Sequence, residues 1–105
     1  MTRESLPARR GNQTTSIEFA GEKYVVSVGY YDDGRPGEIF IDRVKDKVAS
    51  KLGYALDGVC HDAAVAISLL LQFGSTIDTI GGAVIRDEDG EPASIIGAIC
   101  DHLKK

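Results

Sequence analysis

Cys60, His61 and Asp62 are consecutive residues that carry a nucleophile, a base and a carboxylate. They lie within the longest apolar run of the chain, residues 57–74, which we expect to be helical. Neighbouring residues on a helix point about 100° apart, so these three side chains cannot form one catalytic array among themselves. We instead expect Cys60 to be a small buried hydrophobe and His61 to pair with Asp57, one turn earlier. The sequence therefore predicts no catalytic residue.

A metal site is the next alternative, because the chain has two cysteines and two histidines, which are zinc ligands. Neither pair has a finger-like spacing, and a Cys-x-His pair on a helix splays its side chains. An acidic turn at residues 87–92 offers oxygen ligands for calcium, but it lacks the spacing and distal glutamate of an EF-hand loop. We predict no metal site and no cofactor. The zinc candidates set aside here are Cys60, His61, Cys100 and His102.

Composition places the chain among soluble globular proteins. Its 105 residues are enough for one domain with a core, and 43% are hydrophobic and 27% charged. The net charge of −4 argues against a non-specific nucleic-acid binder. Two cysteines and a polar N-terminal stretch favour a reducing cytoplasm over secretion. Residues 57–74 are shorter than the ~20 apolar residues of a membrane span and include charges, so we expect no membrane association.

The apolar run predicts a long central helix at about residues 55–74, which Gly74 ends. Its polar residues gather on another side and form a seam that we expect to touch water. The predicted apolar stripe consists of Leu56, Val59, Cys60, Ala63, Ala64, Ile67, Leu70 and Leu71. The polar seam consists of Asp57, His61, Ser68 and Gln72.

Strand patterns precede this helix at residues 15–20, 24–31 and 38–42. Gly21-Glu22 is the expected first hairpin turn, and residues 32–37 are a dense second turn signal. We predict an α+β fold in which a three-stranded antiparallel β-meander is followed by two to four helices packed on one face. Ser75 or Thr76 is expected to cap a short helix, and Ser94 a last one.

The predicted domain limits are a flexible basic arm at residues 1–14 and a single α+β domain at residues 15–105. Residues 43–54 are ambiguous. Val44, Val48 and Leu52 recur every four residues, which allows a short amphipathic helix, and Gly53 is expected to separate it from the central helix.

Basic and aromatic side chains supply the candidate partner-binding residues. A basic cluster after the third strand could meet a phosphate or an acidic partner, although such a run is more often a solvated helix face. A nucleic-acid site would also draw on the arginines of the arm, but the overall acidity makes nucleic acid an unexpected ligand. The candidates are Arg43, Lys45, Lys47, Lys51, Tyr30, Tyr31 and Arg35.

Two segments carry a resemblance to a known family, YVVSVGYYDDGRPGEIFI at residues 24–41 and LDGVCHDAAVAISLLLQFGSTIDTIGGAV at residues 56–84. Together they resemble the TSCPD domain, which occurs near the C-terminus of some ribonucleotide reductases, notably cobalamin-dependent ones, and as small stand-alone bacterial proteins. The tail GEPASIIGAICDHL, residues 90–103, is similar to the ending of stand-alone members. The cysteine motif that names the family is absent from the first strands, and the segment after Ile41 is longer than the usual loop.

The resemblance implies a non-enzymatic accessory module that binds a protein partner, with ribonucleotide reductase as the first candidate. Two alternatives remain open. One is an inhibitor of phage or mobile-element type that occupies the basic groove of a host protein such as a nuclease complex. The other is a small nucleic-acid binder. The two edges of a three-stranded sheet also leave self-association open.

Overall fold

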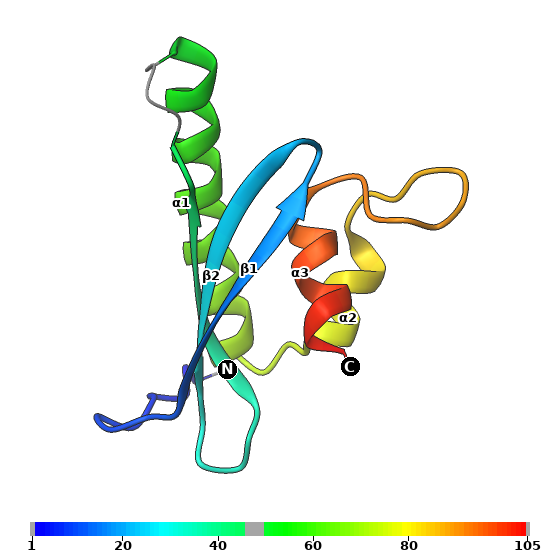
Figure 1. Ribbon diagram of the computed structural model, residues 1–105. Helices are drawn as coiled ribbons and strands as arrows, with labels where there is room; N and C mark the ends of the chain where they lie inside the picture. The colour runs from blue at the N-terminus through cyan, green and yellow to red at the C-terminus, as the bar shows by residue number, and fades with distance from the viewer. Residues whose placement is uncertain (1, 46–49, 105) are drawn as a thin grey trace.

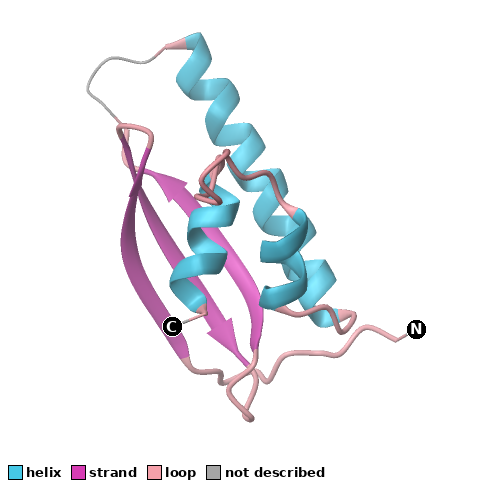
Figure 2. Cartoon of the chain, turned by 90° about the vertical axis from the view of Figure 1, so that its right-hand side faces the viewer, coloured by secondary structure: helices cyan, strands magenta, loops and turns pink. Residues whose placement is uncertain are grey.

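Three strands followed by three helices make up the computed structural model, which describes residues 2–45 and 50–104 (Figure 1). The strands are β1 (Asn12–Phe19), β2 (Glu22–Tyr30) and β3 (Pro36–Arg43), paired antiparallel in the order β1-β2-β3. The helices are α1 (Lys51–Gln72), α2 (Ile77–Ala83) and α3 (Ile95–Leu103). The predicted α+β meander with a long central helix is therefore confirmed, with all three helices against one face of the sheet (Figure 2).

The alternation of apolar residues decides which face of the sheet is covered. Val26 and Val28 of β2 lie opposite Ile41 and Ile39 of β3, and all four side chains are buried. Phe40 points to the other face and is 53% exposed. Because successive side chains of a strand alternate, one face meets the helices and the other meets solvent.

The first hairpin turn lies one residue earlier than predicted. Phe19 pairs with Glu22, so Ala20 and Gly21 form the turn, with φ of 51° and 79°. Two positive φ angles are those of a type I′ turn, whose twist matches that of the paired strands. β1 also begins at Asn12 rather than at residue 15, because its polar first residues pair with β2 without an apolar alternation that would mark them as strand.

The sequence left residues 43–54 ambiguous, and their described part is the end of β3 and the start of α1, while the expected break at Gly53 is wrong. Arg43 ends β3, residues 46–49 lie outside the described residues, and residues 51–54 are the first turn of α1. Ser50 caps this helix by accepting a hydrogen bond from the Gly53 amide at 3.0 Å. A Cβ at Gly53 would lie 2.6 Å from a guanidinium nitrogen of Arg43, so glycine here makes room for that side chain.

Two residues of the polar seam of α1, Ser68 and Gln72, lie along the outer edge of β3, while His61 is exposed to water as expected. Ser68 Oγ accepts a hydrogen bond from the Ile39 amide at 2.9 Å and donates one to its carbonyl at 3.2 Å. Gln72 Nε2 donates to the Gly37 carbonyl at 2.9 Å, and this side chain is buried. These side chains satisfy backbone groups that a further strand would otherwise bind. The expectation that the seam faces water is therefore wrong for both residues.

The apolar stripe of α1 is only partly buried. Its members Cys60, Ala64, Ile67 and Leu71 are in the core, whereas Val59 and Leu70 are 66% and 49% exposed. The reason is that α1 packs on β3, while α3 packs on β1 and α2. The predicted stripe was wider than the surface available to cover it.

Serine and threonine caps begin the two shorter helices as predicted. Thr76 accepts from the Thr79 amide at the start of α2, and Ser94 accepts from the Gly97 amide at the start of α3. Arg86 joins the two helices, since its guanidinium donates to the Gly81 carbonyl at 3.0 Å and to the Asp101 carboxylate at 2.7 Å.

The segment before β1 contacts the C-terminal end of α1. The Glu4 amide donates to the Gln72 carbonyl at 2.7 Å, and Arg3 Nε donates to the Gln72 side chain. Tyr31 Oη donates to the Glu4 carbonyl at 2.8 Å. The Glu4 amide thereby satisfies one of the carbonyl groups that the last turn of a helix leaves free.

α1 is, by length and composition alone, the one helix in the described ranges that could cross a membrane. Its side-chain hydrogen bonds to the edge of β3 and its four core residues are the contacts of a helix that covers a sheet.

Replacement of Ser68 by alanine tests the docking of α1 on β3. Ser68→Ala removes two hydrogen bonds to Ile39 and leaves its backbone groups unsatisfied at a part-buried edge. We expect the free energy of unfolding to fall by about 1–3 kcal/mol in urea denaturation. Ser5→Ala, at an exposed position, is the control and should change little. Equal effects of the two substitutions would contradict this role of Ser68.

Candidate functional site

The predicted partner-binding residues lie at opposite ends of the sheet and form no single site. Arg43 pairs with Tyr24 near the β1–β2 hairpin, whereas Tyr30 pairs with Pro36 at the other end of the same ladder. Exposed Lys45 and Lys51 flank the Arg43 end, and Lys47 lies outside the described residues. Tyr31 and Arg35 belong to the Tyr30 end, in and beside the β2–β3 turn.

Arg43 is occupied within the chain. Its Nε donates to Asp57 Oδ1 at 2.8 Å and its Nη1 to Glu22 Oε2 at 3.3 Å, and its side chain is only 9% exposed. The hydrogen bonds that Arg43 donates to the Asp57 carboxylate raise the pKa of Arg43 above its ordinary range. This guanidinium therefore links β3 to α1 and β2, and only Lys45 and Lys51 of the described basic cluster face solvent.

Tyr31 and Arg35 belong to a second internal cluster. The Arg35 guanidinium lies 4.7 Å from the centre of the Tyr31 ring, a cation–π distance. It donates to both carboxylate oxygens of Glu4 at 3.1 and 2.9 Å and to Asp33 at 2.7 Å. Burial raises the pKa of the Tyr31 hydroxyl above its ordinary value. These contacts tie the β2–β3 turn to the N-terminal segment.

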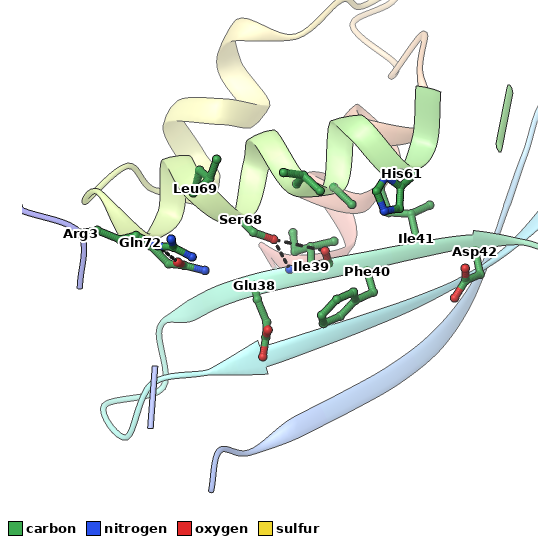
Figure 3. A pocket seen from close by; sticks show the side chains of 12 residues that line it. Arg3, Glu38, Ile39, Phe40, Ile41, Asp42, His61, Ser68, Leu69 and Gln72 are labelled. Carbon is green, nitrogen blue, oxygen red and sulfur yellow. Dashed lines mark hydrogen bonds between the residues drawn. The ribbon is translucent and has the colours of Figure 1, made fainter. Parts of the chain in front are cut away.

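A groove of about 300 Å³ runs between α1 and the edge of β3 (Figure 3). Ser68 and Gln72 occupy the edge at Ile39 and Gly37, but no side chain in the described ranges hydrogen-bonds to the backbone of Ile41. His61 lies beside Ile41 in this groove. It contacts Asp62 at 3.4 Å, so the predicted pair with Asp57 is wrong because Asp57 binds Arg43. The groove offers one exposed imidazole, and the Ser68 hydroxyl that also lines it is bonded to the backbone of Ile39.

The two cysteines are buried free thiols, Cys60 at 2% and Cys100 at 1% exposure. Burial raises the pKa of both thiols, so they are protonated at neutral pH and poor nucleophiles. Cys60 faces the core while His61 and Asp62 are exposed, so the three side chains do not converge. Residues 2–45 and 50–104 contain no group of three His, Cys, Asp or Glu side chains that could hold a metal ion.

The side of α1 turned away from the sheet is apolar and exposed, and sequence reasoning missed it. We call this surface the outer face of α1. Its large side chains are between 38% and 66% exposed, at a spacing that follows one side of a helix. The signal for it was available, because a helix that is apolar on most sides needs more cover than one small sheet provides. The outer face consists of Val59, Val65, Leu69, Leu70 and Phe73, with Ala55, Asp62 and Ala66 among them.

Alkaline pH tests the burial of the thiols. The pKa of Cys60 and Cys100 lies above the ordinary 9.0 in the folded chain, so the unfolded chain loses these protons first. The stability that they contribute is complete below about pH 9 and is lost as the pH rises above it. We expect the urea concentration at the unfolding midpoint to decrease when the pH is raised from about 7.5 to 10. Cys60→Ala combined with Cys100→Ala should show a smaller fall, and an unchanged fall would contradict the assignment.

Comparison with known proteins connects this fold to one class of enzyme. No family model and no solved structure matches the chain. It is 42% identical over 76 residues to a vitamin B12-dependent ribonucleotide reductase of Bradyrhizobium diazoefficiens, which covers 72% of this chain and 6% of the reductase. It is 40% identical over 76 residues to that of Agrobacterium fabrum, covering 72% and 6%, and 35% identical over 78 residues to that of Rhodopirellula baltica, covering 74% and 7%. The chain therefore spans only 6–7% of the length of these relatives, and it is related to a short segment of vitamin B12-dependent ribonucleotide reductases.

Proposed function

We propose that this chain is a non-enzymatic interaction module of the TSCPD type that binds a protein partner in the cytoplasm, and that the partner is a ribonucleotide reductase. The observation that carries the proposal is the outer face of α1. Contiguous exposed apolar surface on a soluble domain is characteristic of a surface that meets another protein.

The chemistry of the outer face suits a partner with an apolar surface. Val59, Leu70 and Val65 are 66%, 49% and 48% exposed, and Leu69 and Phe73 continue the stripe at 38% and 39%. Asp62 is the acidic residue among them. An apolar centre with few charges is the composition of interface cores. A partner helix or sheet face of matching shape would bury these side chains as the core buries their neighbours.

The comparisons support a reductase as the partner. In the relatives, the matching segment is a small part of a much longer enzyme. A module of this size next to a large body of protein has a surface against which an exposed helix face can pack. We propose that the outer face of α1 packs against the body of a reductase.

The buried thiols support the non-enzymatic part of the proposal and its place in the cytoplasm. Cys60 and Cys100 are unpaired and protonated, so neither provides a reactive nucleophile. Free buried cysteines are also stable in a reducing compartment. Within residues 2–45 and 50–104, the hydrogen-bonding contact of the exposed His61 is with the neighbouring Asp62.

A charge on the outer face tests this function. Val59→Asp should weaken capture of a purified vitamin B12-dependent ribonucleotide reductase at least about tenfold, because the carboxylate would be buried without a partner at the interface. The readout is the dissociation constant from biolayer interferometry. Thermal denaturation checks that the variant is folded.

Ile85→Asp is the matched control, because Ile85 is 67% exposed and lies outside α1, while Val59 is 66% exposed. It should leave binding unchanged. If the unsubstituted chain does not bind the reductase, the proposed partner is wrong. If both substitutions weaken binding equally, the outer face of α1 is not the binding surface.

A further inference from the structure

The two edges of the sheet differ in whether side chains of a helix bind them. The edge of β3 is occupied by Ser68 and Gln72 of α1. The other edge belongs to β1, which is contacted by α3 on the covered face of the sheet, through the side of the strand that carries Ile17 and Phe19. An uncovered strand edge is a row of unpaired donors and acceptors and a template for another strand.

The register shows which groups of β1 point outward. The Tyr30 amide donates to the Gly11 carbonyl at 2.9 Å, so Gly11 and Tyr30 form a hydrogen-bonded pair. Such pairs alternate along an antiparallel ladder, so the odd-numbered residues of β1 bond to β2. The backbone amides and carbonyls of Asn12, Thr14, Ser16 and Glu18 then face outward. None of them bonds to another residue within the described ranges.

The side chains of β1 do nothing to discourage pairing. The strand has no lysine, arginine or proline, which natural edge strands use to prevent association, and its only charge is Glu18 near the hairpin. β3, by contrast, begins with Pro36 and ends with Asp42 and Arg43 in addition to its cover by α1. The open edge is thus the one without protection.

We propose that β1 pairs antiparallel with β1 of a second copy of this chain and joins two three-stranded sheets into one of six strands. The two-fold axis would pass through Thr15. Thr14 then lies opposite Ser16 of the second copy, and Asn12 lies opposite Glu18. Every outward-facing backbone group of β1 is used in this register, which gives about eight hydrogen bonds across the interface.

The strand is complementary to itself in this register, and this is the reason for choosing a second copy over a foreign strand. Hydroxyl side chains meet across the interface at Thr14 and Ser16, and Thr15 meets its own copy, a favourable cross-strand combination. The Glu18 side chains of the two copies lie at opposite ends, so like charges do not meet. A two-fold axis normal to the sheet keeps the helices of both copies on the same side.

The proposed dimer leaves the outer face of α1 free. α1 packs on β3, at the far edge of each sheet from β1. Dimerisation and partner binding therefore use different surfaces, and either can fail without the other.

Sedimentation equilibrium of the full chain tests the dimer. The unsubstituted chain should show a reversible monomer–dimer equilibrium below about 0.5 mM. Thr14→Lys combined with Ser16→Lys places like charges opposite each other and should raise the dissociation constant at least about tenfold. Mixing this variant with Thr14→Glu combined with Ser16→Glu should restore a dimer of one chain of each kind.

Ser27→Lys is the control, because Ser27 of β2 contacts Thr14 on the same open face but lies one strand inward from the edge. It should dimerise like the unsubstituted chain, and circular dichroism should show that all variants are folded. A chain that stays monomeric up to about 0.5 mM overturns the proposal. So does a dimer that the lysine pair leaves unchanged, or one that Val59→Asp abolishes instead. Binding of only a foreign extended peptide at this edge, without self-association, also overturns it.

Discussion

The docking of a helix onto the edge of a small sheet is the contact on which the rest of this structure depends. A three-stranded sheet has two edges and one apolar face, and here a single long helix covers one edge and part of the apolar face. Ser68 and Gln72 bind the backbone of β3 at Ile39 and Gly37, while the neighbouring Cys60 and Ile67 enter the core. The same helix therefore fixes its own position by hydrogen bonds at the edge and by apolar contacts over the face.

This arrangement has a consequence for the remaining surface of α1. Since β3 lies on one side and α2 and α3 cover other parts of the molecule, the outer face has no cover within the described residues. Its apolar side chains are the main feature of the molecule that its own stability does not explain. Together with the relation to a short segment of vitamin B12-dependent ribonucleotide reductases, they are the observations from which we propose a protein partner. Cys60, Cys100 and Arg43 are candidates for chemistry in the sequence, but the two thiols are buried and protonated and Arg43 is paired with Asp57.

The sequence predicted the fold class, because strand alternation and the helical apolar run are local signals. The caps at Thr76 and Ser94 were predictable for the same reason. The errors arose where tertiary contacts decided the outcome. In the sequence alone, Gly53 indicates a helix break, whereas in the structure it makes room for the Arg43 side chain. The polar Ser68 likewise indicates a solvent-exposed position, whereas in the structure it binds the edge of β3. The exposure of Val59 depends on how many elements reach α1, and the pairing of Arg43 with Asp57 joins residues on different elements.

Amide hydrogen exchange at single residues tests the docking of α1 most directly. Ile39 and Ile41 are both buried residues of β3, but only the Ile39 amide is bonded to Ser68. We expect the Ile39 amide to exchange far more slowly than the Ile41 amide, and to approach the Ile41 rate when Ser68 is replaced. Equal exchange at the two amides in the unsubstituted chain would show that α1 does not hold the edge of β3, and would contradict the account.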